Sequence, residues 1–342
     1  MKKNSPRLAT VITSINAPTK AVARYSKWST PLFVVGDKKS PATWLCSGVH
    51  YMPWNWGADK ESSRLKVLDD YIGFNTYGRK MLGYVAAAKT GAQFIFETDD
   101  DNIPYANAED ALTRAAGESG GWACSQSASS QTAGWVNMYS VFTSRRIWPR
   151  GFPLDLIDAT VSTKRDKLHA GIVQYLADGD PDVDAIYRLL FKRRTYFRRS
   201  GRRTAVALGK VCPFNSQATL WPANYFPLMF LPIGCSDRVT DILRGLMVSK
   251  ALQCEGKSIA FEAPIVYQER NAHNLIRDLE AEVPLYTTVR SFIERATVDK
   301  YDNAIAAFRA LLAQAISAGI IPERNLAVFD CFSSLVSSPR SK

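Results

Sequence analysis

The sequence predicts an α/β protein with a parallel sheet, and three observations support this prediction. Strand-like and helix-like segments alternate over about the first 100 residues, as expected where helices connect parallel strands. The 342 residues, of which 46% are hydrophobic, provide a core for one large domain or two smaller ones. Polar residues follow each predicted strand, where ligands bind in such sheets.

The first predicted strand, residues 8–16, is rich in β-branched side chains and ends in small polar ones. Pro18 then opens a helix. A second buried strand lies within residues 31–41 and ends at Gly36 and Asp37. The apolar spacing of residues 77–91 predicts a helix that stops at a glycine. Residues 92–102, "AQFIFETDDDN", form the next strand.

The remaining chain is less regular. A turn over residues 178–181 precedes a helix that Asp182 caps, and a further helix begins near Val239. Residues 304–319 have the pattern of an amphipathic helix. Because no internal repeat or long linker interrupts the chain, we expect one α/β domain with a helical C-terminal appendage.

The composition is that of a folded, basic protein, with 22% charged and 11% aromatic residues and a formal net charge of +11. Seven Arg and Lys residues, with aromatics between them, lie in residues 191–204. This basic segment is either a solvated loop or a patch for an anionic membrane surface or an acidic acceptor. No nucleic-acid-binding motif accompanies it, so we expect no nucleic-acid partner.

Six scattered cysteines without a CxxC pair predict reduced, mostly buried thiols. The N-terminal apolar run is short and broken by polar residues, so it does not resemble a signal peptide. No apolar run approaches the ~20 residues of a membrane-spanning helix. We therefore expect a cytoplasmic protein, with peripheral association at the inner membrane face through the basic segment.

The acidic triplet Asp99, Asp100 and Asp101 directly follows the buried run "FIFE". Like charges repel, so their placement at a strand end requires a cation. Asp99 and Asp101 can project the same way and share Mg²⁺ or Mn²⁺, which prefer carboxylates together with phosphate oxygens. An ordinary acidic loop is the alternative. The offsets of the Gly and Glu of a calcium EF-hand are absent.

Other charged residues are candidates for the same site. Arg79 and Lys80 begin a helix, where cations oppose the helix dipole unless an anion is bound; a solvated surface is the alternative. Asp37 follows "VVG" and is either a turn residue or an acceptor for a uracil or ribose. His273 is either a structural hydrogen-bonding residue or a further metal ligand.

Asp237 and Asp241 lie four residues apart at the start of a predicted helix. One of them caps the helix in the simplest interpretation. The alternative is a general base that deprotonates an acceptor hydroxyl. Arg238 and Arg244 are the candidates for keeping these aspartates ionised.

Several long motifs together resemble a known family: "ITSINAPT", "VVGDKKSP", "YGRKMLGYVAAAKTGAQFIFETDDDN", "PFNSQATLWP", "RVTDILRG" and "YQERNAHN". They are similar to the STELLO-type glycosyltransferases of the plant Golgi and their bacterial relatives. The resemblance covers about residues 8–285. The plant members carry a transmembrane anchor that has no counterpart in this sequence, so we expect the catalytic domain alone.

This resemblance implies a GT-A-like fold, a Rossmann-type mixed sheet flanked by helices, over residues 1–285. Residues 1–110 would form the nucleotide-sugar-binding half and residues 111–285 the acceptor-binding half. Residues 286–342 would form the helical extension.

GT-A enzymes hold Mn²⁺ or Mg²⁺ on the diphosphate of a nucleotide sugar through a DxD motif. The resemblance therefore implies Asp99 and Asp101 as metal ligands, with Asp100 near the donor sugar. His273 matches the C-terminal histidine that often completes the metal shell. The positions implied for nucleotide-sugar binding are Thr13, Ser14, Asn16, Asp37, Arg79, Lys80, Asp99 and Asp100.

The implied activity is metal-dependent transfer of a sugar from a nucleotide-diphosphate donor, most commonly a UDP-sugar, to a hydroxyl of a glycan or glycolipid. An acidic residue at a helix start is the usual base of inverting members. Asp241 fits that role first and Asp237 second, so we expect inversion; a retaining course would need no such base. Two alternatives are a nucleotide-sugar mutase and a non-catalytic GT-A-like partner or scaffold protein.

Overall fold

The computed structural model describes residues 7–56, 63–118, 122–132, 134–199, 203–271, 273–298 and 300–337. Part of the basic segment, residues 200–202, lies outside the described residues.

A ten-stranded sheet runs through the described part of the chain, in the order β3-β2-β1-β4-β9-β7-β6-β8-β10-β5. Strands β1 to β4 are parallel, and the later half is mixed. The strands are β1 (Leu8–Thr13), β2 (Leu32–Val35), β3 (Val49–Met52), β4 (Phe94–Thr98), β5 (Asn102–Pro104), β6 (Trp122–Ser130), β7 (Val161–Gly179), β8 (Thr204–Val206), β9 (Ala218–Pro222) and β10 (Lys257–Gln268).

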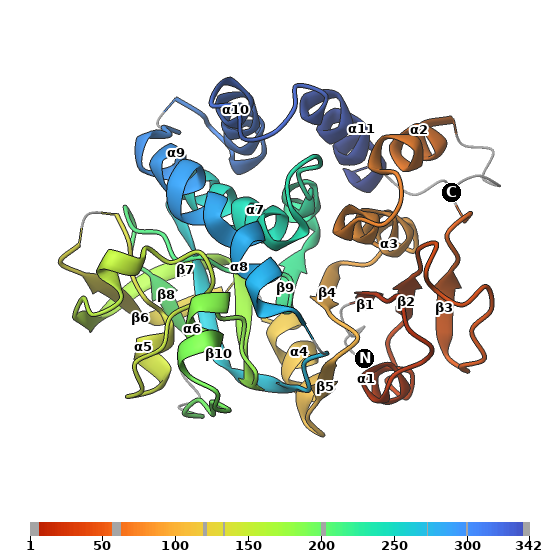
Figure 1. The fold of residues 1–342 in the computed structure, drawn as a ribbon, viewed down its shortest axis with the longest axis horizontal. Coiled ribbons are helices and arrows are strands. Elements are labelled where there is room, and N and C mark those ends of the chain that lie inside the picture. Colours follow the sequence, from red (N-terminus) through yellow and green to blue (C-terminus); the bar gives the residue numbers. More distant parts are fainter. Residues whose placement is uncertain are drawn as a thin grey trace.

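Helices cover the sheet and extend along one edge of the molecule (Figure 1). The α-helices are α1 (Lys20–Tyr25), α2 (Ser63–Ile72), α3 (Lys80–Lys89), α4 (Ala108–Ala116), α5 (Tyr139–Phe142), α6 (Ala185–Leu190), α7 (Asp237–Ala251), α8 (Leu275–Pro284), α9 (Arg290–Arg295), α10 (Ala304–Ser317) and α11 (Asn325–Ser337). Short 3-10 helices are η1 (Tyr77–Arg79), η2 (Leu154–Leu156), η3 (Ala223–Met229) and η4 (Leu252–Glu255), and η5 (Leu285–Val289) is a π-helical turn.

Successive side chains of a strand point to opposite faces of the sheet, and both faces are buried. In β1, Ala9 and Val11 belong to one hydrophobic cluster, whereas Leu8 and Ile12 belong to a second cluster on the other face. This is the behaviour of a strand covered by helices on both sides. Helix α3 approaches closely, because a Cβ on Gly83 would lie 2.6 Å from the side chain of Val11. The predicted α/β class is confirmed.

The predicted helical C-terminal appendage is also confirmed. Helices α10 and α11 pack against α2, α3, α7 and η3 and lie side by side along the top edge in Figure 1. Their apolar side chains, including those of Phe308, Phe329 and Phe332, are part of the larger core cluster. Among the described residues, no helix combines the length and apolar character needed to cross a membrane.

Some local predictions were wrong. The cap of α6 is Asp184, whose side chain accepts a hydrogen bond from the Tyr187 backbone N–H, and not Asp182, which binds Arg150 instead. All six cysteines are free, but only Cys124 and Cys212 are fully buried. Strand β3 and helix α2 were not anticipated, because their sequences lack a clear apolar period.

The directions of the strands bring distant segments of the chain to one edge of the sheet. Strand β9 is antiparallel to both β4 and β7, and β10 is parallel to β7. The carboxyl ends of β1, β2, β4, β7 and β10 therefore all lie at the same edge. Residues that follow these five strands can meet there, although more than 150 positions separate Asn16 from Gly179 in the sequence.

Candidate functional site

A cavity of about 680 Å³ opens at this edge of the sheet. It is bordered by the ends of the parallel strands, by η1 and by the N-terminus of α7. The predicted site residues that line it are Thr13, Ser14, Asn16, Asp37, Arg79, Asp99, Asp100, Asp101, Asp237, Asp241 and His273. The structure thus brings together residues from six separate segments of the sequence. Three of these segments, which contain Asn16, Asp37 and Asp99, were predicted to meet because each follows a parallel strand.

Asp100 connects the acidic triplet to the loop after β1. Its Oδ2 accepts hydrogen bonds from the Ser14 hydroxyl at 2.5 Å and from the Asn16 side-chain amide at 3.0 Å. The Thr19 hydroxyl donates to the Asp100 carbonyl. Asp100 therefore fixes the shape of the loop that borders the cavity, and its carboxylate faces Ser14 and Asn16 rather than its neighbouring aspartates.

Asp99 is held by a cation and a hydroxyl. Its Oδ1 lies 2.8 Å from Nζ of Lys80 and accepts a hydrogen bond of 2.8 Å from the Tyr77 hydroxyl. Lys80 is fully buried and also donates to the Ser216 carbonyl. Lys80 does not line the cavity. Its positive charge lies beneath the cavity, next to the Asp99 carboxylate.

Asp101 has the weakest compensation of the three carboxylates. Its Oδ2 accepts one hydrogen bond, from the neutral amide of Gln268 at 3.0 Å. Its Oδ1 is buried and has no hydrogen-bond partner within the described residues. Burial, together with the charges of Asp99 and Asp100, raises the pKa of Asp101 to about 7. An unpartnered buried carboxylate oxygen is costly unless a cation or a proton compensates it.

The described side chains alone do not form a complete metal-binding site. Among the described residues, no group of three His, Cys, Asp or Glu side chains is arranged to hold a metal ion. His273 lines the same cavity, but its Nδ1 lies 3.3 Å from Asp278. Mg²⁺ commonly binds one or two protein carboxylates together with substrate phosphates. Asp99 and Asp101 fit that kind of site, in which the diphosphate supplies further oxygens.

Asp37 and Arg79 connect the loops that surround the cavity. The Asp37 carboxylate accepts hydrogen bonds from the backbone N–H groups of Lys38 and Thr76. The Arg79 guanidinium pairs with Asp69 at 2.9 Å and donates to three backbone carbonyls, and it is 1% exposed. With all its nitrogens engaged by the protein, Arg79 supports these loops, in contrast to its predicted role in nucleotide-sugar binding.

Asp241 is buried and clamped by an arginine. Both of its carboxylate oxygens lie 3.1 Å from Nη2 of Arg150. Arg150 also pairs with Asp182 at 2.8 Å. Burial alone would raise the pKa of Asp182, but the guanidinium outweighs this effect and lowers it to about 2.

The arginines expected to hold the two aspartates have other partners, which corrects that prediction. Arg238 pairs with the buried carboxylate of Glu282. Arg244 pairs with Glu97 at 2.7 Å, and both side chains are fully buried. Glu97 also accepts hydrogen bonds from the Trp221 indole and the Tyr84 hydroxyl. This network ties β4, which carries the acidic triplet, to α7.

Asp237 is the more accessible of the two candidate bases. It is the first residue of α7 and is exposed, and its Oδ1 accepts hydrogen bonds from the Tyr77 backbone N–H and the Thr76 hydroxyl. The cap itself is Ser236, whose side chain accepts from the Arg238 N–H. Desolvation by neighbouring atoms raises the pKa of Asp237, and the charges of Asp241 and Asp37 add to this rise.

Two plant proteins are similar in sequence to this chain. Over 264 residues, or 73% of this chain, it is 25% identical to "Probable glycosyltransferase STELLO2" of Arabidopsis thaliana. Over 275 residues it is 25% identical to "Probable glycosyltransferase STELLO1" of the same plant. The similarity supports a STELLO-type family. The predicted resemblance is thereby confirmed, while no family model matches the chain. The chain spans about a third of the length of these relatives, 34% and 33%.

Several residues of this site could not be singled out from the sequence. They are Lys39, Tyr77, Arg150, Asp182, Asn215, Gln217, Gln268 and Arg270. Most lie on segments whose positions depend on the pairing of β7 and β10 with the rest of the sheet. Six of them lie in motifs that carry the family resemblance, such as "PFNSQATLWP" and "YQERNAHN", but those motifs did not indicate a role for these individual residues.

Proposed function

We propose that this chain is a glycosyltransferase domain that moves a sugar from a nucleotide-diphosphate donor, a UDP-sugar, to a hydroxyl of a glycan or glycolipid acceptor. The proposal rests on the sequence similarity to two proteins named as probable glycosyltransferases. It also rests on a cavity at the carboxyl edge of the sheet, where α/β proteins bind nucleotides.

The observation that carries the proposal is the uncompensated carboxylate of Asp101. Its Oδ1 is buried and finds no hydrogen-bond partner among the described residues, and Asp101 lines the cavity together with Asp99. A divalent cation, Mn²⁺ or Mg²⁺, would stabilise these carboxylates and the negative charge that develops on the departing diphosphate. Asp99 and Asp101 would hold this cation.

The nucleoside end of the donor would lie against the loop after β1. Asp100 holds Ser14 and Asn16 of this loop, and Thr13 and Asp37 line the adjoining wall. Because the side chains of Ser14, Asn16 and Asp37 are already fixed by hydrogen bonds, they would lose little conformational freedom on binding. Their place beyond β1 and β2 supports the assignment.

Asp237 suits the role of general base better than Asp241, contrary to the order predicted from the sequence. A base needs an accessible oxygen and a pKa that is not depressed. Asp237 is exposed and its pKa is raised, whereas Arg150 binds both oxygens of Asp241. In the proposed reaction, Asp237 takes the proton of the acceptor hydroxyl. The hydroxyl oxygen then attacks the anomeric carbon, and the nucleotide diphosphate leaves with its bonding electrons, which inverts the configuration.

Product analysis tests this proposal. The purified protein would be incubated with a set of nucleotide sugars and Mn²⁺, with and without an acceptor mixture, and the products separated by chromatography. We expect release of nucleoside diphosphate that depends on the acceptor and is lost in Asp101→Ala. Rearrangement of the donor without an acceptor would indicate a mutase, and the absence of any turnover with every donor would contradict the proposal.

A further inference from the structure

A second cavity, of about 380 Å³, adjoins the first one. The two share Arg270, Asn271 and His273 as lining residues. The second cavity lies between the turn after β7, helix α6 and the loop that follows α6. Nothing in the proposed donor site uses it, although it opens directly beside that site.

The two cavities have opposite charge. The first is lined by seven aspartates and five cationic side chains. The second is lined by five cationic side chains and a single carboxylate, that of Asp180. Its cations are Arg188, Lys192, Arg193, Arg194 and Arg270. An acidic cavity needs a metal to bind a phosphate group, whereas a cationic cavity binds an anion directly.

Arg188 has unused hydrogen-bonding capacity in this cavity. It is 8% exposed, pairs with Asp180 at 2.9 Å and donates to the Pro181 carbonyl. Its Nε is buried and finds no hydrogen-bond partner within the described residues. A buried guanidinium N–H without an acceptor costs free energy that a bound anion would recover.

Arg270 has the same property at the junction of the two cavities. It pairs with Asp278 at 3.0 Å, while its Nε is buried without a partner among the described residues. Burial and the nearby charges of Arg188 and Arg238 lower the pKa of Arg270 to about 10. Burial and the nearby charge of Arg270 also lower the pKa of His273, which lies beside it. Arg188 and Arg270 thus each have one carboxylate partner and one buried Nε–H that finds no acceptor within the described residues.

We propose that the second cavity binds a phosphate or diphosphate group of the acceptor, with Arg188 and Arg270 as its buried contacts. This inference rests on the proposed transferase function and specifies its acceptor as a phosphorylated molecule. The exposed Lys192 and Arg193 at the cavity mouth would attract the anion, and Arg188 and Arg270 would bind it after desolvation. The acceptor hydroxyl would then extend from the second cavity into the first, towards Asp237.

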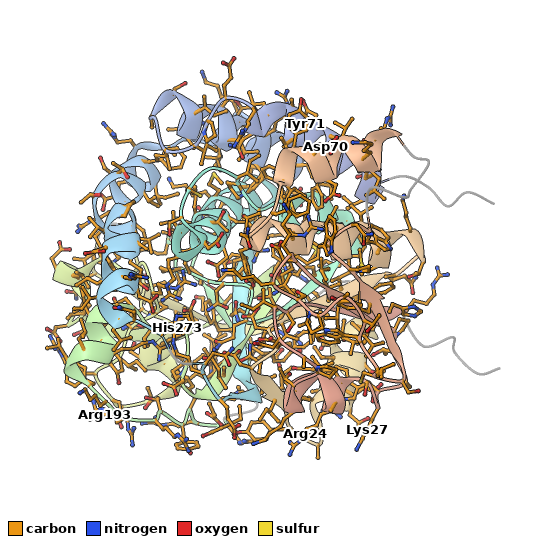
Figure 2. The ribbon with its side chains drawn as sticks, turned by 45° about the vertical axis from the view of Figure 1, so that its right-hand side comes forward. Arg24, Lys27, Asp70, Tyr71, Arg193 and His273 are labelled. Carbon is orange, nitrogen blue, oxygen red and sulfur yellow. The ribbon has the colours of Figure 1, made fainter. Side chains whose placement is uncertain are left out.

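Inorganic pyrophosphate is the probe that tests this site. Its binding would be measured by calorimetry in EDTA, so that no metal recruits it to the acidic cavity. The test variant is Lys192→Glu/Arg193→Glu, which reverses two exposed charges. The control, called the α1 variant, is Arg24→Glu/Lys27→Glu, which makes the same change of charge on α1 and just after it. Figure 2 shows Arg24 and Lys27 away from Arg193. Arg188→Gln tests the buried contact, with its thermal midpoint confirming the fold.

The wild type is expected to bind pyrophosphate, and the affinity should fall at least about tenfold in Lys192→Glu/Arg193→Glu and in a folded Arg188→Gln. The α1 variant should stay within about twofold of the wild type. Equal weakening by both charge-reversed variants, or no pyrophosphate binding by the wild type, would overturn the proposal. Binding of UDP with Mn²⁺ to the wild type is measured in parallel. If the wild type does not bind UDP, the proposed donor site is contradicted, whereas the pyrophosphate result still tests the second cavity on its own.

Competition against bound pyrophosphate distinguishes a soluble phosphorylated acceptor from a lipid-linked one. Displacement of pyrophosphate by a sugar 1-phosphate indicates a soluble acceptor, and displacement by phosphatidylcholine vesicles containing phosphatidic acid indicates a lipid-linked one. Either result supports the proposed site. Vesicle binding that pyrophosphate does not reduce and that the Arg188→Gln change does not weaken would show a membrane-binding surface in place of a phosphate site, and would overturn the proposal.

Discussion

Nζ of Lys80 lies 2.8 Å from Oδ1 of Asp99, and the lysine is fully buried beneath the cavity. Lys80 begins α3 and Asp99 follows β4, so this pair fixes the first residue of the acidic triplet to the neighbouring helix. In the absence of a ligand, the positive charge of Lys80 compensates the negative charge of the Asp99 carboxylate.

A substitution of Lys80 should therefore distinguish the structural role of this lysine from the role of a bound Mn²⁺. We expect Lys80→Met to lower the free energy of unfolding by about 2 kcal/mol, because Asp99 loses its buried partner but stays partly exposed. Mn²⁺ should then raise the thermal midpoint of Lys80→Met by more than that of the wild type, since binding to the native state stabilises it. Equal shifts for the two proteins would show that Lys80 and the cation do not share Asp99.

The buried pair of Glu97 and Arg244 should contribute strongly to stability. Glu97→Gln leaves the Arg244 guanidinium buried without a counter-charge, so we expect a loss of about 3–5 kcal/mol. The control is Asp70→Asn, which breaks an exposed pair with Lys66 on α2 and should cost no more than about 0.5 kcal/mol. Figure 2 shows Asp70 on the outer surface of the molecule. Urea denaturation measures both, and similar losses would contradict the assigned role of the network.

The raised pKa of Asp101 predicts a pH dependence of stability. In the folded protein this carboxyl binds a proton as the pH falls below about 7, whereas in the unfolded chain it stays ionised down to about pH 4. The folded state binds the extra proton in this window, so its contribution to stability increases as the pH falls from about 7 to about 4, by at most ~1.4 kcal/mol per unit.

Urea unfolding in EDTA at pH 7.5 and pH 5.5 measures this effect. The comparison of the wild type with Asp101→Asn isolates it, because other titrating groups are common to both proteins. We expect a steeper gain in stability at lower pH for the wild type. Parallel pH profiles would show that Asp101 is already compensated in the folded protein.

The two candidate bases should differ in their effects on turnover. We expect Asp237→Asn to lower kcat by about 10²–10⁴-fold, as is typical of the loss of a general base, while the affinity for UDP changes little. Asp241→Asn should act on stability instead, because it removes one of the two carboxylates bound by Arg150. Steady-state kinetics with a donor that is turned over decides this, and the reverse ranking would make Asp241 the base.

The sequence predicted the parts of the site that depend on local pattern. The apolar runs before Asn16, Asp37 and Asp99 indicate buried strands, and parallel strands place their carboxyl ends together. All three residues or their immediate neighbours line the cavity. The positions of Asp237 and Asp241 at a helix start were predicted in the same way, from the polar residues that precede an apolar helix.

The pairings between distant side chains were not predictable. Arg150 lies in an irregular segment, and its contact with Asp241 depends on how β7 and α7 are arranged in three dimensions. The same applies to Arg244, which was predicted as a partner of the two aspartates at the start of α7 but which pairs with Glu97. A sequence shows which charges need compensation, whereas the tertiary fold decides which residues provide it.

Binding of UDP with and without Mn²⁺, measured by calorimetry, tests whether the acidic triplet holds a metal-bound nucleotide diphosphate. We expect Mn²⁺ to strengthen UDP binding to the wild type by at least about tenfold, equivalent to ~1.4 kcal/mol. Asp101→Ala should lose this gain, and the matched surface variant Asp70→Ala should keep it. Equal affinities with and without Mn²⁺ in the wild type, or a full gain in Asp101→Ala, would contradict the assignment of the acidic triplet to a metal-bound nucleotide diphosphate.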